Sequence, residues 1–118
     1  EEIEEAYGPA APEVLKLEQE VGKNADNEVL RRRSVWEEKQ EEIGSVLENL
    51  PSAKTVAQIL KSMGAPSSPA EIQVSLETFK KGIYFAKDLR NRFGLLQILF
   101  DFSLQKTCSE ILEEEFYR

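Results

Sequence analysis

The sequence predicts an all-α protein, a multi-helix bundle of about five to seven helices that forms one domain over residues 1–118. Apolar residues recur at spacings of three and four along most of the chain, which is the period of one helix face. No stretch alternates apolar and polar residues, as a half-buried strand would. Proline, serine and glycine stand between the periodic stretches, where helices start and stop.

The N-terminal quarter predicts two short helices. Residues 1–7 suit a helix that ends at Gly8. Pro12 fits the first position of the next helix, where its missing N–H group costs nothing. That helix should end near Gly22, and its apolar face carries Val14, Leu17 and Val21.

A long third helix is expected from a cap at Asp26 or Asn27 to about Leu50. Apolar residues repeat in it every seven positions, with Leu47 beside them: Val29, Trp36, Ile43 and Leu50. Packing within the protein's own domain is the favoured interpretation of this stripe. A coiled coil is the alternative, although Lys39 and Gln40 interrupt the pattern and fewer than four heptads are present.

Pro51 stops that helix, and Ser52 can cap a fourth helix that ends before Gly64. The expected buried stripe of this helix is Val56, Ile59, Leu60 and Met63. Ser68 and Glu71 then form a capping-box pattern around Pro69, which predicts a short helical turn.

The stretch from Ser75 to Leu104 is expected to be the central helix, capped by Ser75 and interrupted by Gly94. Its apolar face carries Phe79, Ile83, Ala86, Leu89, Phe93, Leu96 and Phe100. From Phe93 to Phe102 apolar residues cover almost the whole circumference, so this half should enter the core with Leu96 and Phe100 buried. A final helix is expected over Thr107–Tyr117, with Cys108, Ile111 and Leu112 facing inward.

Composition excludes several classes of function. The net charge of −7 argues against a nucleic-acid partner, because phosphate backbones require a basic surface. No apolar run is long enough for a membrane span, so we expect no membrane partner. The single cysteine, Cys108, cannot form an internal disulfide, which favours a reducing cytoplasm and an inert core thiol.

The chain contains no histidine, which removes the commonest general base and the commonest transition-metal ligand. Arg90 and Arg92 suggest a phosphate clamp, because guanidinium groups match phosphate geometry. Two residues two positions apart in a regular helix point to different faces, however, so structural roles are the favoured interpretation.

Other candidates also have a simpler structural explanation. The basic run Arg31-Arg32-Arg33 lies within helical reach of acidic residues and should form a solvated, salt-bridged face. The acidic runs Glu41-Glu42 and Glu113-Glu114-Glu115 diverge on a helix and are not expected to act as an acid–base pair. Tyr84 could line a cleft, but a half-buried packing role is favoured.

Several segments together resemble a known family. Leu50-Pro51-Ser52, Gly64-Ala65-Pro66, Pro69-Ala70-Glu71-Ile72 and Ala86-Lys87-Asp88-Leu89-Arg90-Asn91-Arg92-Phe93 occur in an order that resembles the C-terminal helical region of sn-glycerol-1-phosphate dehydrogenases. These enzymes belong to the glycerol dehydrogenase and iron-containing alcohol dehydrogenase superfamily, whose fold is also that of dehydroquinate synthase. The resemblance covers roughly residues 29–101. Gln73 stands where the family usually has glycine, and Gly94 where it has threonine or serine.

The resemblance implies an NAD(P)-linked oxidoreductase that acts on a small polyol phosphate and holds a divalent metal, often zinc, between two domains. The family's metal ligands, an aspartate and two histidines, lie upstream of the matched region. This chain lacks histidine and a Gly-x-Gly-x-x-Gly loop, so we expect no catalytic, cofactor-binding or metal-binding residue in it and no activity alone; substrate-binding residues stay unknown.

Two functional hypotheses remain. The chain begins at Glu1 without an initiator methionine, which favours a C-terminal fragment that packs against a missing N-terminal nucleotide-binding domain. The alternative is a free-standing helical interaction module derived from the same scaffold. In either case we expect a homo-oligomer that forms through the apolar surface around Phe93 to Phe102.

Overall fold

The computed structural model describes residues 2–118, and within that range every regular element is helical, which confirms the all-α prediction. Glu1, the first residue of the first expected helix, lies outside the described residues. The elements are α1 (Glu2–Tyr7), η1 (Gly8–Ala10), α2 (Ala11–Val21), α3 (Asp26–Glu38), α4 (Gln40–Glu48), α5 (Ala53–Ser62), η2 (Ala70–Ile72), α6 (Leu76–Phe85), η3 (Ala86–Asp88), α7 (Leu95–Asp101) and α8 (Gln105–Tyr117), where η denotes a 3₁₀ turn.

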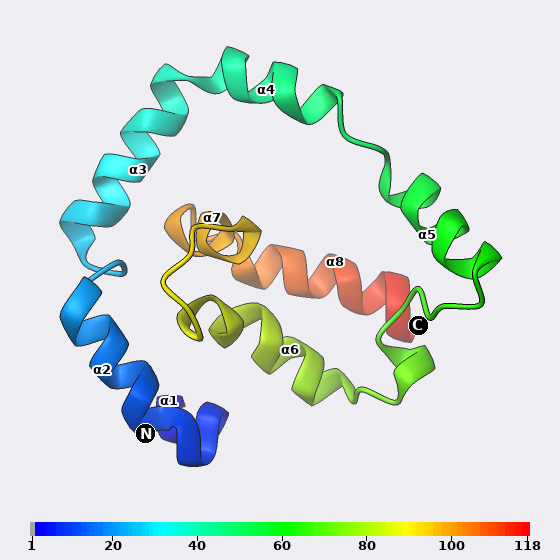
Figure 1. Cartoon of the computed structure of the whole chain (residues 1–118), viewed down its shortest axis with the longest axis horizontal. Coiled ribbons are helices and arrows are strands. Elements are labelled where there is room, and N and C mark those ends of the chain that lie inside the picture. Colours follow the sequence, from blue (N-terminus) through cyan, green and yellow to red (C-terminus); the bar gives the residue numbers. More distant parts are fainter. Residues whose placement is uncertain (1) are drawn as a thin grey trace.

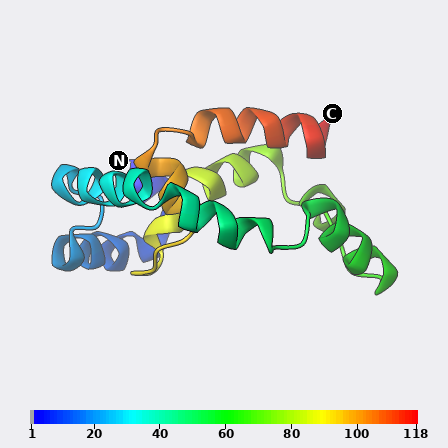
Figure 2. The same cartoon turned by 90° about the horizontal axis from the view of Figure 1, so that it is seen from above.

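The helices form an open ring around a central group. Helices α2 to α5 follow an outer arc, and α6, α7 and α8 lie inside it (Figure 1). Seen from the edge the molecule is flat (Figure 2), with extents of 42 × 41 × 23 Å. Its radius of gyration is 16.3 Å, whereas a compact domain of this length would have about 13.5 Å. The outer arc is therefore only partly packed onto the centre.

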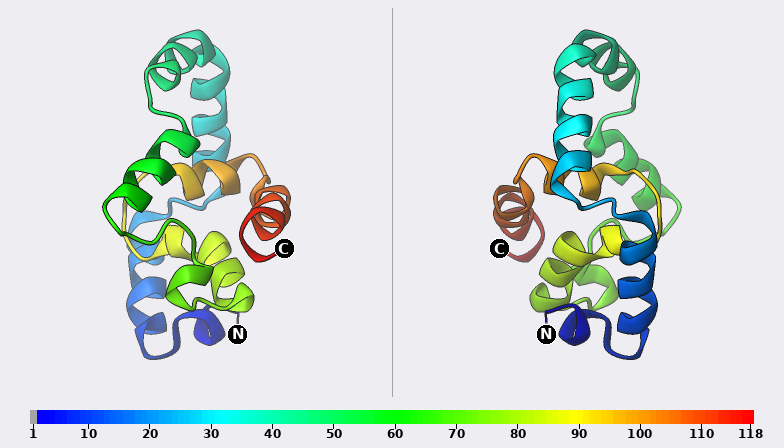
Figure 3. Two further views of the ribbon diagram at one scale, coloured as in Figure 1. Left: turned by 90° about the vertical axis from the view of Figure 1, so that its right-hand side faces the viewer. Right: turned by 90° about the vertical axis from the view of Figure 1, so that its left-hand side faces the viewer.

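Packing is concentrated at one side of the ring. Helix α6 packs against α8, α7 packs against α3 and α8, and α1 packs against α2 and α6. The ring of Phe79 on α6 meets the rings of Phe116 and Tyr117 on α8, with centroids 6.1 and 5.6 Å away. Helix α4 projects to the end of the molecule opposite α1 (Figure 3) and packs closely only on α3.

Several local signals are confirmed. The Ser52 and Ser75 hydroxyls each accept a hydrogen bond of 3.1 Å from the amide three residues later, and so cap α5 and α6. Gly22 ends α2 in the left-handed conformation with φ of 62°. The final helix is present but begins at Gln105, two residues before the expected start.

The prediction of one long third helix is wrong. Lys39, with φ of −108° and ψ of 13°, interrupts the helix and separates α3 from α4. The predicted cap is also wrong. Ala25 holds the N-cap position with no side-chain bond, and Asp26 is already the first helical residue. The interruption turns the chain at the place where Lys39 and Gln40 break the apolar stripe.

The predicted central helix is likewise broken. Helix α6 ends at Phe85, η3 follows, and residues 89–94 are irregular before α7 begins at Leu95. The backbone carbonyls of Lys87 and Arg90 accept hydrogen bonds from the Lys23 ammonium group in this segment. A carbonyl satisfied by a side chain no longer needs the helical amide four residues later.

The buried residues of α7 are polar, contrary to prediction. Gln97 and Asp101 are each 2% exposed, whereas Leu96 and Phe100 are only half-buried. Among the described residues the fully buried apolar side chains are Ala11, Val14 and Ile83. A network of hydrogen bonds therefore occupies the centre, where the sequence suggested an apolar core.

The predicted buried stripes of the outer arc and of α8 are also wrong in part. The large exposed apolar residues of α4 and α5 and the turns after them are Val46, Leu47, Leu50, Val56, Ile59 and Met63. Ile111 on α8 is exposed as well, while Cys108 and Leu112 are half-buried. In the described part of the chain α5 packs closely on no other helix, because it stands away from the central helices (Figure 1).

Gln73 and Gly94 have backbone conformations that bear on their residue types. Gln73 ends η2 with φ of 59°, a left-handed conformation that favours glycine. Gly94 holds the N-cap of α7 in extended backbone, and no side chain accepts a bond from the first turn there. A serine or threonine would supply that acceptor. At η2, Glu71 accepts a bond from the Ser67 amide, so the predicted capping box with Ser68 is only partly formed.

Candidate functional site

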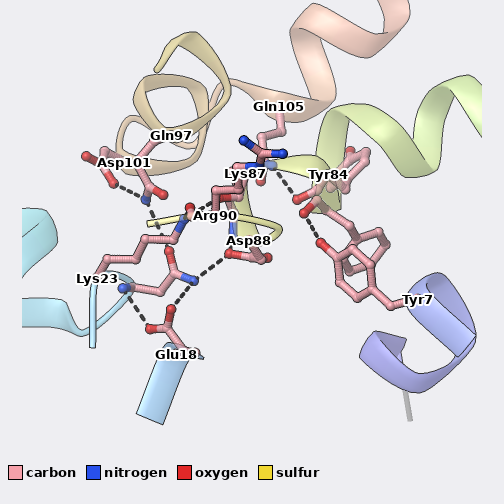
Figure 4. A network of polar contacts seen from close by, with 12 residues as sticks. Tyr7, Glu18, Lys23, Tyr84, Lys87, Asp88, Arg90, Gln97, Asp101 and Gln105 are labelled. Atoms are coloured by element: carbon pink, nitrogen blue, oxygen red, sulfur yellow. Dashed lines mark hydrogen bonds and ion pairs between the residues drawn. The ribbon is translucent and has the colours of Figure 1, made fainter. Parts of the chain in front are cut away.

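Buried and half-buried polar side chains from five parts of the chain meet between α2, α3 and α7, and Figure 4 shows most of them. We call them the polar cluster, and it comprises Glu18, Lys23, Asn24, Arg32, Lys87, Asp88, Gln97 and Asp101. Three of these residues are acidic and three are basic. The cluster is therefore internally neutral, which makes its burial tolerable.

Asn24 joins the two halves of the cluster. Its side-chain Nδ2 donates to Glu18 Oε2 at 3.2 Å and to Asp88 Oδ1 at 2.9 Å. Its Oδ1 accepts a bond of 3.1 Å from Gln97 Nε2. Every polar atom of the amide is thus engaged, and α2, η3 and α7 are tied together through one residue.

An ion pair links α3 to α7. The Arg32 guanidinium donates to both carboxylate oxygens of Asp101, from Nε at 2.6 Å and from Nη2 at 2.8 Å. Nη2 also donates to the backbone carbonyl of Lys23 at 2.6 Å. The guanidinium lies over the ring of Phe93, 5.9 Å from its centroid. No bond from Arg32 Nη1 is found among the described residues, which leaves two N–H donors available.

Lys23 holds the irregular segment after η3 in place. Its ammonium group donates to the carbonyl of Lys87 and, at 2.9 Å, to that of Arg90. Burial lowers the pKa of Lys23 below its usual range, and Lys87 and Arg32 add to the effect, while the charge of Asp88 opposes it. Two of its three N–H donors are used in these bonds.

Gln97 carries the one orphaned polar atom in the cluster. Its Nε2 donates to Asn24 Oδ1 and to Asp101 Oδ1, each at 3.1 Å. Both neighbouring atoms are acceptors, so the amide nitrogen of Gln97 must face them and the amide cannot be flipped. Its oxygen, Oε1, therefore points away from Asn24 and Asp101. Within the part of the chain described, that buried oxygen has no hydrogen-bond donor.

Two cavities flank this residue. The first has a volume of about 250 Å³ and is lined by Lys23, Arg32, Val35, Trp36, Asn91, Arg92, Phe93 and Gln97. The second has a volume of about 390 Å³, and Arg90, Arg92 and Gln97 are among its lining residues. Arg92 and Gln97 thus border both cavities. No carboxylate lines the first cavity, which three cationic side chains surround.

The predicted candidates are distributed unevenly around this site. Arg90 and Arg92 lie in irregular backbone, so the argument from a regular helix does not apply to them. Arg92 borders the first cavity and Arg90 only the second. Within the basic run, Arg31 forms the expected exposed pair with Glu28 at 3.0 Å, but Arg32 is buried in the cluster and Arg33 lies over the Phe102 ring.

The remaining candidates lie outside the cluster. Glu42 pairs with Lys39 at 2.8 Å, and Glu113 pairs with Lys80, which lowers the pKa of Glu113. Tyr84 is half-buried beside Phe85, as the packing interpretation predicted. Cys108 is a half-buried free thiol.

Sequence reasoning missed most of the cluster. Only Gln97 and Asp101 could have indicated the cluster from the sequence. They are the polar residues in an otherwise apolar stretch, and they stand four positions apart, on one face of α7. Lys23 and Asn24 follow the end of α2 and looked only like a helix stop. Their partners in η3, in the segment after it and in α7 are more than sixty residues away in the sequence, and no local pattern reveals such pairs.

The comparison with known proteins gives one partial match. Over 65 residues the chain is 32% identical to the glycerol-1-phosphate dehydrogenase [NAD(P)+] of Bacillus licheniformis. The match covers 55% of this chain and 16% of that enzyme, so the chain spans only a small part of the relative. No family model matches, and no solved structure matches.

Two features of the described residues bear on the class of site. Among residues 2–118 no helix is both long and apolar enough to cross a bilayer. The same residues contain no group of three or more potential metal ligands drawn from histidine, cysteine, aspartate and glutamate. The polar cluster therefore offers charged donors and amides rather than a metal-binding set.

Proposed function

We propose that this chain is the C-terminal helical part of an NAD(P)-dependent, metal-dependent polyol-phosphate dehydrogenase related to glycerol-1-phosphate dehydrogenase. The observation that carries the proposal is the 65-residue similarity to the Bacillus licheniformis enzyme. The all-helical fold agrees with it. In this role the chain forms one wall of the cleft between two domains and a packing surface for the nucleotide-binding domain, in the cytoplasm.

The residues of this chain do not fit a catalytic metal or a nicotinamide cofactor. The sequence has no histidine, and the described residues form no cluster of metal ligands. The two cavities, of about 250 and 390 Å³, lie at or below the lower end of the roughly 300–1,000 Å³ typical of pockets for drug-sized ligands, and a dinucleotide is larger than such ligands. The metal and cofactor would therefore be held by other parts of the enzyme, and this chain is inactive alone.

The exposed apolar faces of α4 and α5 support the packing role. Their apolar side chains are exposed, and α4 and α5 belong to the outer arc of the ring (Figure 1). An apolar surface of this kind usually contacts another protein surface. The nucleotide-binding domain of the same enzyme is the partner that this proposal requires.

A segment exchange tests the proposal. The matched 65-residue region of the Bacillus licheniformis enzyme is replaced by the corresponding region of this chain, and reduction of dihydroxyacetone phosphate by NAD(P)H is measured. We expect measurable activity, and a chimera with a scrambled segment of the same composition serves as the control. A folded chimera without activity would contradict the proposal and favour the alternative, a free-standing interaction module.

A further inference from the structure

Helices α7 and α8 form an apolar groove that opens to solvent. It has a volume of about 250 Å³, and among its lining residues in the described part of the chain none is charged. The lining residues are Leu99, Leu104, Thr107, Cys108, Ile111 and Leu112. Leu104 is 45% exposed and Ile111 is 61% exposed. Because α8 lies along one broad side of the flat molecule (Figure 2), the groove is accessible to another protein.

Carboxylates border one side of this groove. Ile111 is followed on α8 by Glu114 and Glu115, three and four positions later, the spacing that places residues on one side of a helix. Glu115 is exposed and, within residues 2–118, unpaired. The pair of Glu114 with Arg118, at 3.5 Å, is itself exposed and therefore weak. The rim of the groove is thus negative, on a chain whose net charge is −7.

The negative rim decides between the possible occupants of the groove. A second copy that placed its own α8 here would bring the Glu114 and Glu115 carboxylates of both chains together, and like charges oppose such a contact. An anionic lipid surface would be repelled for the same reason. A helix with an apolar stripe and basic residues beside the stripe suits both features, because its apolar side chains fill the groove and its cations face the rim.

We propose that this groove binds a basic amphipathic helix of a partner protein, with an aliphatic side chain between Leu104 and Ile111 and lysine or arginine residues beside Glu114 and Glu115. Recognition of this kind uses apolar anchors at positions i, i+3 or i+4, and i+7 of the bound helix. Leu104 and Ile111 are themselves seven positions apart, so two turns of α8 face the partner. The inference goes beyond the proposed dehydrogenase function and does not depend on it.

A synthetic helical peptide tests the proposal. The probe has leucine at the anchor positions, lysine beside the leucine stripe and a fluorescent label, and its anisotropy is followed during titration with the full chain. We expect saturable binding. Cys108, the single cysteine of the chain, lines the groove, so a bound probe should slow its reaction with a neutral maleimide at least about tenfold. No saturable binding, or binding that leaves the Cys108 reaction unchanged, would overturn the proposal.

Two control peptides separate the apolar contribution from the electrostatic one. The first keeps the leucines and replaces each lysine with glutamate, and the second keeps the composition of the probe but scrambles the leucine positions. We expect each to bind at least about tenfold more weakly than the probe. Equal affinity of the glutamate peptide would contradict the role of the rim. Equal affinity of the scrambled peptide would indicate general attraction between opposite charges and would contradict a groove.

Glu114 and Glu115 are tested against a matched acidic pair, Glu41 and Glu42 on α4, which are also exposed. Replacing both members of either pair with glutamine changes the net charge equally. We expect the α8 double variant to weaken probe binding at least about tenfold and the α4 double variant to change it by less than about threefold. Equal losses in the two double variants would contradict a rim that contacts the bound helix.

Ile111→Glu and Ile59→Glu form a second matched pair, because both replace an exposed isoleucine, on α8 and α5 respectively, with a charged residue. We expect Ile111→Glu to abolish probe binding and Ile59→Glu to change it by less than about threefold. Circular dichroism should show that both variants keep the helix content of the unchanged chain. Light scattering then identifies the occupant. If Ile111→Glu alone converted a dimer into a monomer, a second copy would fill the groove and the proposal would be wrong.

Discussion

The carboxylate of Asp101 on α7 accepts two hydrogen bonds, of 2.6 and 2.8 Å, from the guanidinium of Arg32 on α3. The side chain of Asp101 is 1% exposed and that of Arg32 is 12% exposed. This pair connects the outer arc to the central helices. Because the apolar core is small, such polar links have a larger share in holding the fold together than in a typical helical bundle.

Asp101→Asn should lower the free energy of unfolding by about 3–5 kcal/mol, because it leaves the Arg32 guanidinium buried without its counter-ion. Arg31→Ala is the control, since the neighbouring Arg31 forms an exposed pair with Glu28 and should cost only about 0–1 kcal/mol. Urea unfolding followed by circular dichroism gives both values. Similar small losses in the two variants would contradict a structural role for the Arg32–Asp101 pair.

Tyr7 anchors α1 to the end of α6, because its hydroxyl donates to the backbone carbonyl of Phe85. Burial raises the pKa of Tyr7 above its ordinary value of 10.0, and the charge of Asp88 adds to the effect. The raised value means that the folded state keeps the proton more tightly than the unfolded chain does. The stabilisation is therefore fully present below pH 10 and is lost progressively as the pH rises above it.

Tyr7→Phe should cost about 1–2 kcal/mol at pH 7 by leaving the Phe85 carbonyl unpaired, and it should flatten the loss of stability above pH 10. Lys23 acts in the opposite direction, because its lowered pKa makes stability rise as its ammonium group deprotonates. Comparing the two proteins at each pH cancels the contribution of Lys23. Parallel stability curves for Tyr7→Phe and the unchanged chain above pH 10 would contradict the Tyr7 account.

Gln73→Gly should stabilise the protein by about 0.5–1 kcal/mol. Gln73 has φ of 59°, and this left-handed conformation costs a residue with a side chain about 1–2 kcal/mol. Glycine avoids that cost, but its greater freedom in the unfolded chain offsets part of the gain. Gln73→Ala retains the strain and is the control. Thermal unfolding should show a higher midpoint for the glycine variant alone, and a lower one would mean that the Gln73 side chain stabilises the turn.

The sequence predicted local structure well and long-range structure poorly, for a physical reason. Helix period, the serine caps at Ser52 and Ser75, and the stop at Gly22 depend on neighbouring residues. The irregular segment before α7, by contrast, is bonded to Lys23, which is 64 residues away from Lys87. The same distance hid the polar cluster, and the apolar residues from Phe93 to Phe102 suggested a core where Gln97 and Asp101 are the buried side chains.

Self-association through the surface around Phe93 to Phe102 stays a prediction, and the structure narrows it to two residues. Phe93 and Leu95 are 54% and 69% exposed, whereas residues 96–102 are half-buried or buried. Exposed apolar residues so close together favour contact with another copy, and a two-fold dimer is the commonest closed arrangement. Light scattering of the full chain should give a mass near twice 13.4 kDa.

Leu95→Glu and Ile59→Glu distinguish this surface from the exposed faces of α4 and α5. Both replace an exposed apolar residue with a charged one, so neither should unfold the protein. We expect Leu95→Glu to restore the monomer and Ile59→Glu to leave the dimer intact, because a buried carboxylate without a partner opposes only the interface that contains it. A monomer in Ile59→Glu and a dimer in Leu95→Glu would place the interface on α5 instead. If the unsubstituted chain is already a monomer, the exposed apolar residues are tolerated in water.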